Sequence, residues 1–137
     1  MSGSAPKTEP HREPKGDLSL RVLAMPADTN PSGHIFGGWV LGQMDIAGGF
    51  HAAGHSGGRT VTVAVDAMQF HKPVHVGDEV SCYTRIMRVG RTSVSVMVET
   101  WVRRSRLGPP TLVTEGLFTY VAVDDAGTPL EILNKTF

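Results

Sequence analysis

The chain has 137 residues, of which 40% are hydrophobic, and its 13 lysines and arginines balance 13 aspartates and glutamates. This length allows one domain with a real core and is too short for two, while the zero net charge offers no electrostatic argument for binding nucleic acid or an anionic membrane surface. The single cysteine excludes an internal disulfide, and no segment approaches the ~20 apolar residues that span a bilayer. We therefore expect a cytoplasmic protein.

The first part of the chain has the composition of a tail. Residues 1–16 contain three of the nine prolines among charged and small residues. Such a segment buries too little apolar surface to offset the entropy lost on ordering. We expect residues 1–16 to be disordered and residues 17–137 to form the single domain.

The elements predicted after this tail are one strand, one helix and four further strands. Residues 18–25 favour a strand, and a turn-rich loop follows to residue 35. From Phe36 to about Ala53 apolar side chains recur every three or four residues, which is typical of a helix, and several glycines follow. Alternation of apolar and polar residues then predicts strands over 59–70, 79–89, 92–104 and 112–123.

These four later strands are expected to form a meander. In the third of them the alternation places Val94, Val96 and Val98 inward and Ser93, Ser95 and Met97 outward. Cys82 lies in the second and is expected to be a buried structural thiol. A lone helix and one antiparallel sheet are best combined in an α+β domain whose sheet wraps the helix. The open edges of such a sheet favour an oligomer.

The predicted helix carries an acid beside a strip of glycines. Asp45 has Gly42, Gly48 and Gly49 within about one turn on its face. Each glycine inside a helix costs about 0.5–1 kcal/mol relative to alanine, which indicates close packing against this strip. Packing does not explain the acid, because a buried carboxylate is costly unless it is hydrogen-bonded or paired. Asp45 is therefore a candidate functional acid or base.

A second candidate feature lies at the start of the same helix. The free N–H groups around Gly37 and Gly38, with the positive end of the helix dipole, suit an anion or a developing oxyanion, although a Gly-Gly pair also makes a sharp turn. Eight residues separate Gly37 from Asp45, about 12 Å along the axis, which is too far to reach one reacting carbonyl. Two antiparallel helices related by a two-fold axis would bring Asp45 of one chain to Gly37 of the other.

Three motifs carry a resemblance to a known family. They are the Asn, Gly-Gly and Asp within residues 30–45, "FHKP" at 70–73 and "VGRTS" at 89–93. Together they resemble hotdog-fold acyl-CoA thioesterases of the YciA-like group, over residues 18–123. The resemblance implies one long central helix wrapped by a five- to six-stranded antiparallel sheet. It also implies that Asp45 acts as general base or nucleophile, while the Gly37 amide and Asn30 polarise the thioester carbonyl across a dimer interface.

The resemblance further implies a site for the coenzyme A part of the substrate. The residues expected to form it are Gly38, His34, Phe70, His71, Lys72, Arg88, Gly90, Arg91, Thr92 and Ser93. Lys72 and Arg91 are the favoured cations for its phosphates, and the "RRSR" run at 103–106 is interpreted as a solvated hairpin end. We expect no cofactor and no metal ion. The expected assembly is a homodimer with shared sites, combined into a hexamer.

Two other functions remain open at this level. A non-catalytic acyl-CoA-binding or sensing protein of the same fold would keep the Gly37 region and the basic turns without needing Asp45. An enoyl-CoA hydratase or dehydratase typically uses a histidine, and His34 keeps that reading open. Acyl-chain length, and the choice between base and nucleophile for Asp45, do not follow from the sequence.

Overall fold

The structure is a computed structural model in which residues 13–137 are described. The predicted tail thus lies mostly outside the described residues, and its disorder stays a prediction. Of its last residues, Lys15 donates its backbone N–H to a carboxylate oxygen of Glu99 at 3.1 Å.

The order of elements matches the predicted order. The elements are β1 (Asp17–Leu23), the 3-10 helix η1 (Pro26–Asp28), α2 (Gly37–Ser56), β2 (Thr60–Phe70), β3 (Glu79–Val89), β4 (Ser93–Arg103) and β5 (Thr111–Ala122). The helix continues three residues past the predicted end at Ala53. Gly57 ends it, with a φ of +83° that suits glycine and an N–H that bonds to the Ala53 carbonyl.

All five strands belong to one antiparallel sheet with the order β1-β3-β4-β5-β2. Strands β3, β4 and β5 form a meander as predicted, but the expected pairing of β2 with β3 is wrong. Strand β2 pairs with β5 instead and forms an edge of the sheet. The connection over 71–78 is too long for a tight hairpin, and its backbone bonds His71 N–H to the Val113 carbonyl at 2.7 Å. Alternation predicts a strand but not its partner.

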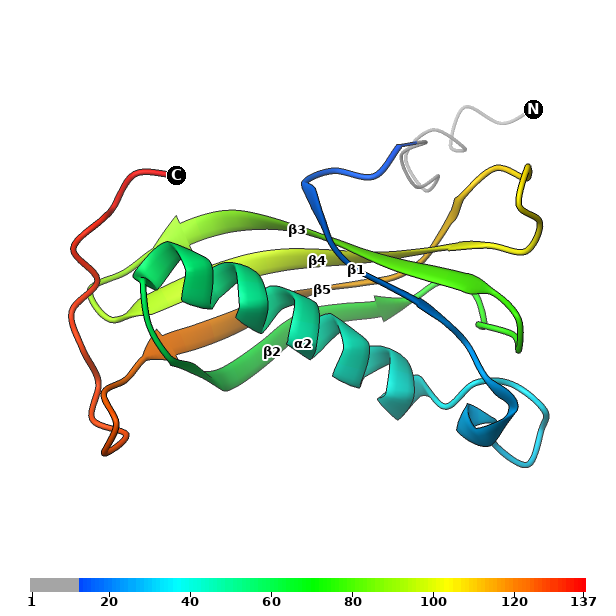
Figure 1. Cartoon of the computed structure of the whole chain (residues 1–137), viewed down its shortest axis with the longest axis horizontal. Coiled ribbons are helices and arrows are strands. Elements are labelled where there is room, and N and C mark those ends of the chain that lie inside the picture. The colour runs from blue at the N-terminus through cyan, green and yellow to red at the C-terminus, as the bar shows by residue number, and fades with distance from the viewer. Residues whose placement is uncertain (1–12) are drawn as a thin grey trace.

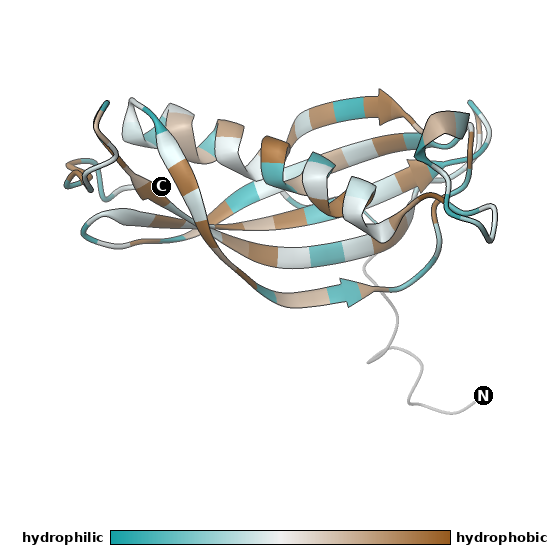
Figure 2. Ribbon diagram, turned by 90° about the horizontal axis from the view of Figure 1, so that it is seen from below, coloured by the Kyte–Doolittle hydropathy of each residue, from teal (hydrophilic) through white to brown (hydrophobic). Residues whose placement is uncertain are grey.

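The helix lies across one face of the curved sheet, so the domain has two layers, as expected (Figure 1). Figure 2, turned by 90°, shows apolar residues alternating with polar ones along the strands beneath the helix. The predicted inward residues Val94, Val96 and Val98 are fully buried, together with Met44 of the helix. Ser95 lies on the opposite face of β4, yet it is buried too, because it pairs with Thr119 of β5.

Cys82 is fully buried in β3, as expected of a structural thiol. Burial raises its pKa to about 11, and only a thiolate is a strong nucleophile. No helix formed by residues 13–137 is long and apolar enough to cross a membrane.

The β2 side of the domain is open and partly apolar. β1 and β2 are the two edge strands, and β2 exposes Val63, Val65 and Phe70. On the helix, Ile46 is exposed as well, whereas the exposed Phe50 lies on the β1 side, where it lines a depression with Asp17 and Ser19. An apolar edge with unpaired backbone groups favours association with another strand.

Candidate active site

Asp45 lies in the middle of α2, on the flank of the helix next to β2 and β5. Its Oδ1 accepts hydrogen bonds from the hydroxyl of Thr62 on β2 at 2.7 Å and from that of Tyr120 on β5 at 3.1 Å. Within residues 13–137, Oδ2 accepts no hydrogen bond and the carboxylate forms no ion pair. The carboxylate is thus oriented by two neutral donors, and no described cation neutralises it.

The glycines beside Asp45 make room for Tyr120. A Cβ on Gly48 would overlap the Tyr120 hydroxyl oxygen, and one on Gly49 would lie 3.3 Å from the ring. Gly42 has open space around it in the described chain. The close packing inferred from the sequence is therefore confirmed for two of the three glycines, and the side chain that packs there is the one that holds the acid.

The phenol of Tyr120 is buried beneath the helix, with only 1% of the residue exposed. Burial and the negative charge of Asp45 raise the pKa of this hydroxyl well above its usual range. Tyr120 therefore stays protonated and remains a donor to the carboxylate at neutral pH.

The start of the helix presents free donors. The helix begins at Gly37, and Phe36 before it provides no side-chain cap. The N–H groups of Gly37 and Gly38 bond to no acceptor within residues 13–137. The ring of Phe70, at the end of β2, lies beside Gly37, 3.6 Å from where its Cβ would be. An electronegative atom at this helix start would meet free N–H groups and an apolar wall.

Asn30 lies in the loop before the helix with its side chain oriented by the backbone. Its Oδ1 accepts from the N–H groups of Ser32 at 2.9 Å and His34 at 3.1 Å. With the oxygen engaged in this way, the NH₂ group points out of the turn, and it has no partner among the described residues. Asn30 is therefore placed to donate to a ligand.

The side chain of His34 is exposed and stacks on His75, with ring centroids 5.1 Å apart. No hydrogen bond fixes either imidazole to an acid within residues 13–137. The pair forms part of the loop surface at the same end of the molecule as the start of α2.

The residues predicted to bind coenzyme A lie at two opposite ends of one protomer. Phe70, His71 and Lys72 precede β3, whereas the turn at 89–93 follows it. An extended strand of 11 residues spans about 33 Å, and Figure 1 shows the two connections at opposite ends of the sheet. A single protomer does not bring the two groups together.

At the first end, the backbone N–H groups of His71 and Lys72 bond to the Val113 carbonyl on β5. The His71 ring also contacts Glu115 at 2.8 Å. The side chain of Lys72 is exposed and has no partner among the described residues. Lys72 is thus a cation without a described partner at this end.

At the other end, the C-terminal segment holds the turn between β3 and β4. Ile132 donates its N–H to the Arg91 carbonyl at 2.8 Å, and Lys135 Nζ donates to the Gly90 carbonyl at 3.0 Å. Within the turn, the Gly90 N–H bonds to the Ser93 carbonyl at 2.7 Å. The turn is closed further by a bond from Ala122 to the Thr92 carbonyl. The side chains of Arg88 and Arg91 are exposed there.

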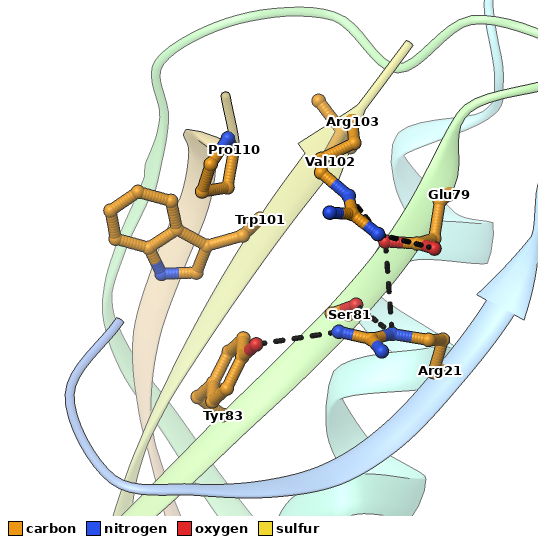
Figure 3. A pocket seen from close by; sticks show the side chains of 8 residues that line it. All are labelled: Arg21, Glu79, Ser81, Tyr83, Trp101, Val102, Arg103 and Pro110. Atoms are coloured by element: carbon orange, nitrogen blue, oxygen red, sulfur yellow. Dashed lines mark hydrogen bonds and ion pairs between the residues drawn. The ribbon is translucent and has the colours of Figure 1, made fainter. Parts of the chain in front are cut away.

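A depression of about 70 Å³ lies on the face of the sheet away from the helix (Figure 3). Its charged groups pair with one another. Arg103 donates to both oxygens of Glu79 at 3.0 and 3.2 Å, and Arg21 lies 3.7 Å from the same carboxylate. The hydrogen bond from Arg103 lowers the pKa of Glu79. This depression contains none of the predicted site residues and is held together by its own ion pairs.

Two larger depressions, of about 350 and 460 Å³, flank the C-terminal half of the helix next to His51 and His55. His51 is hydrogen-bonded to Thr84 at 2.7 Å and His55 to the Asn134 carbonyl at 2.8 Å. Asp45 lines neither depression. Within one protomer, the acid thus lies outside these depressions and on the open β2 side.

The fold and the acid together define a class of protein, a hotdog domain with a carboxylate in the middle of its central helix. Residues 32–108 match the family model described as the thioesterase superfamily. The acyl-CoA thioester hydrolase YciA of Escherichia coli K12 is 52% identical over 122 residues, covering 87% of this chain and 92% of that protein. The chain belongs to the thioesterase superfamily.

The solved structures that resemble this chain include thioesterases as well. A hexameric thioesterase from Yersinia pestis is 52% identical with a TM-score of 0.85, over 89% of this chain and 99% of that chain. A hexameric broad specificity acyl-coenzyme A thioesterase is 48% identical with a TM-score of 0.83, over 90% of this chain and 85% of that chain. The resemblance inferred from the motifs is thereby confirmed.

Sequence reasoning missed both partners of Asp45. Thr62 and Tyr120 lie 17 and 75 residues from it, and each is an ordinary strand residue in its local pattern. The bulky residue implied by the glycine strip was the only available signal for Tyr120. The contact of Lys135 with the Gly90 turn had no signal at all.

Proposed function

We propose that this protein hydrolyses acyl-CoA thioesters to a free carboxylic acid and coenzyme A. The observation that carries the proposal is the state of Asp45, whose Oδ1 is fixed by Thr62 and Tyr120 while its Oδ2 has no partner among the described residues. A carboxylate prepared in this way suits a base or nucleophile better than a structural acid. The names of the relatives, acyl-CoA thioester hydrolases and thioesterases, point to the same reaction.

The proposed chemistry follows from a carboxylate on one side of the thioester carbonyl and hydrogen-bond donors on the other. As a general base, Asp45 takes a proton from water while the water oxygen adds to the thioester carbonyl carbon. As a nucleophile, it adds to that carbon itself and a water later hydrolyses the anhydride. In both versions the carbonyl oxygen becomes an oxyanion, for which the Gly37 N–H and the Asn30 amide are the proposed donors. The carbon–sulfur bond then breaks and coenzyme A leaves as a thiolate. In the general-base version the thiolate takes the proton that Asp45 removed from water, and in the nucleophilic version it takes a proton from water.

The site we propose is shared between two protomers. The helix start lies about 12 Å along the axis from Asp45, so the two groups must come from different chains to act on one carbonyl. The open β2 edge, with Val63 and Val65 exposed, supports a two-fold pairing of this edge with its copy. Its relatives include hexamers, and we propose the same assembly, a hexamer made of three such dimers, for this chain.

A two-fold pairing also explains the split coenzyme A site. Antiparallel pairing reverses one protomer relative to the other, so that the β3–β4 turn of one chain approaches the 70–73 segment of its partner. Lys72 and Arg91 are the proposed cations for the phosphates. The walls of the site would come from both chains: Phe70 and His71 from one, and Arg88 with the Gly90–Ser93 turn from the other.

The proposed reaction uses a carboxylate, amide donors and water, so it needs no cofactor beyond the coenzyme A that the substrate brings. We propose a cytoplasmic location, supported by the lone buried thiol of Cys82, and no nucleic-acid partner, supported by the balanced charge. A protein that only binds acyl-CoA would not need the carboxylate of Asp45, so this alternative leaves the acid unexplained. The hydratase alternative rests on His34, which is exposed and stacks on His75.

The test is release of free thiol from a series of acyl-CoA substrates, from short to long, by the intact protein and by Asp45→Asn. We expect turnover by the intact protein and a loss of about a hundredfold or more in the variant, the range for removal of a catalytic base. Gel filtration checks that the variant still assembles. Asp125→Asn, an exposed acid after β5, is the control and should keep full activity. No turnover of any thioester by the intact protein would contradict the proposed function, and a fully active Asp45→Asn would contradict the role of Asp45 in it.

A further inference from the structure

We infer that Tyr120 is a positioning residue for Asp45, and that Gly48 is a glycine because the Tyr120 hydroxyl occupies the space of its side chain. The inference rests on the proposed function of Asp45 and deepens it. It concerns the orientation of the acid, which decides where the free Oδ2 points.

The hydroxyl of Tyr120 contacts Asp45 at two points. It lies 3.1 Å from Oδ1 and 3.0 Å from the backbone carbonyl oxygen of the same residue. One O–H group thus links the carboxylate to the helix backbone that carries it. Thr62 donates to the same Oδ1 from the other strand. Turning the carboxylate about its last torsion would break both bonds, so Oδ2 is kept as the outward oxygen.

Tyr120 has no route to a substrate of its own. The residue is 1% exposed and lies between the helix and the sheet, near the ring of Phe118. An effect of its hydroxyl on the reaction must therefore pass through Asp45. A catalytic group that buried neighbours already hold in the productive geometry does not have to be ordered during the reaction, so no entropy is lost at that step.

The space beside Gly48 is limited chiefly by this hydroxyl, with the Tyr120 ring and Val98 close behind it. A Cβ there would overlap the hydroxyl oxygen and also lie 3.1 Å from Val98. By contrast, a Cβ on Gly42 or Gly54, in the same helix, would have nothing within 4 Å in the described chain. An alanine would suit the helix better than glycine at all three positions. Only at Gly48 does the described packing forbid it.

The experiment compares steady-state kinetics and thermal unfolding of Tyr120→Phe with those of the intact protein. Phenylalanine keeps the ring and removes only the hydroxyl. We expect kcat to fall about tenfold, the scale of one hydrogen bond to a charged group, with KM unchanged because Tyr120 does not touch the substrate. A role in packing alone would lower Tm and leave kcat intact.

Gly48→Ala is a second variant that perturbs the same hydroxyl, because the added methyl group on the helix would overlap it. Its Cβ would displace the phenol, so kcat should fall as in Tyr120→Phe and Tm should fall as well. In the Tyr120→Phe background the added methyl meets no hydroxyl, although the ring and Val98 remain close to it, so its effect on kcat should be smaller. Gly54→Ala is the matched control and should leave kcat and KM unchanged.

Asp45→Asn, measured in the same series, separates the two ways of failing. If it is inactive while Tyr120→Phe keeps full kcat, the positioning role is overturned and the proposed function stands. If Asp45→Asn keeps full activity, Asp45 is not the base or nucleophile and the positioning role of Tyr120 falls with it. If the intact protein turns over no acyl-CoA, the proposed function itself has failed. An equal fall of kcat in Gly48→Ala with or without the Tyr120 hydroxyl would overturn the link between these two residues.

Discussion

Asp45 and Glu99 are two carboxylates on opposite sides of the same sheet, and they are held in different ways. Glu99, on the face away from the helix, is 1% exposed and accepts from Arg85 at 3.0 Å, from the Trp101 indole at 3.0 Å and from the Lys15 backbone. Asp45 is half-buried and accepts from two hydroxyls on one oxygen. A cation and several donors make a carboxylate part of the framework. Neutral donors on one oxygen orient the carboxylate and leave its other oxygen without a partner among the described residues.

The largest difference between the two carboxylates should appear in how much the protein's stability falls when each is replaced by its amide. We expect Glu99→Gln to lower the free energy of unfolding by about 2 kcal/mol, because it removes the charge from buried hydrogen bonds. Asp45→Asn should change it by less than about 1 kcal/mol, because an amide oxygen still accepts from neutral hydroxyls. Denaturant unfolding at one protein concentration measures both. Folded Glu99→Gln should keep its kcat, and equal losses of stability in the two variants would break the comparison.

A smaller effect should follow from removing the other hydroxyl that holds Asp45. We expect Thr62→Val to lower kcat about fivefold, corresponding to about 1 kcal/mol for one hydrogen bond. Thr62→Ser keeps the hydroxyl and should restore the rate. Initial rates over a range of substrate concentrations give kcat and KM for both. A serine variant as slow as the valine variant would show that the methyl group, rather than the hydrogen bond, matters here.

The smallest effect concerns the half-buried ion pair of Arg103 and Glu79, on the same outer face as Glu99. The hydrogen bond from Arg103 holds the pKa of Glu79 below its ordinary value of 4.5. A carboxyl group whose pKa is lowered by folding adds stability above its unfolded pKa, and this contribution is lost as the pH falls through the folded value. Thermal unfolding should therefore show Arg103→Gln slightly less stable than the intact protein at pH 7. The difference should begin to shrink as the pH falls below 4.5 and should vanish only below the lowered folded pKa of Glu79. A difference that persists at lower pH would mean that Arg103 acts through packing.

Local pattern was enough to predict most of the fold. Periods of two and of three to four residues are set by strand and helix geometry, so the helix and all five strands were found within a few residues. The inward valines of β4 followed from the same alternation. The position of β2 did not, because the pattern of an edge strand resembles that of a central one. Its pairing with β5 depends on contacts some 50 residues away in the chain.

In the candidate site, too, some features follow from the sequence alone and others depend on the tertiary structure. The sequence by itself determined the mid-helix acid, the glycine strip and the glycine pair at the helix start, because each follows from spacing along a single helix. The same spacing predicted a site shared with a second chain. Only the tertiary structure decided that Thr62 and Tyr120 hold the acid, that Tyr120 accounts for Gly48, and that the two basic turns lie at opposite ends of a protomer. These are contacts between segments distant in the chain, and the packing of the sheet against the helix sets them.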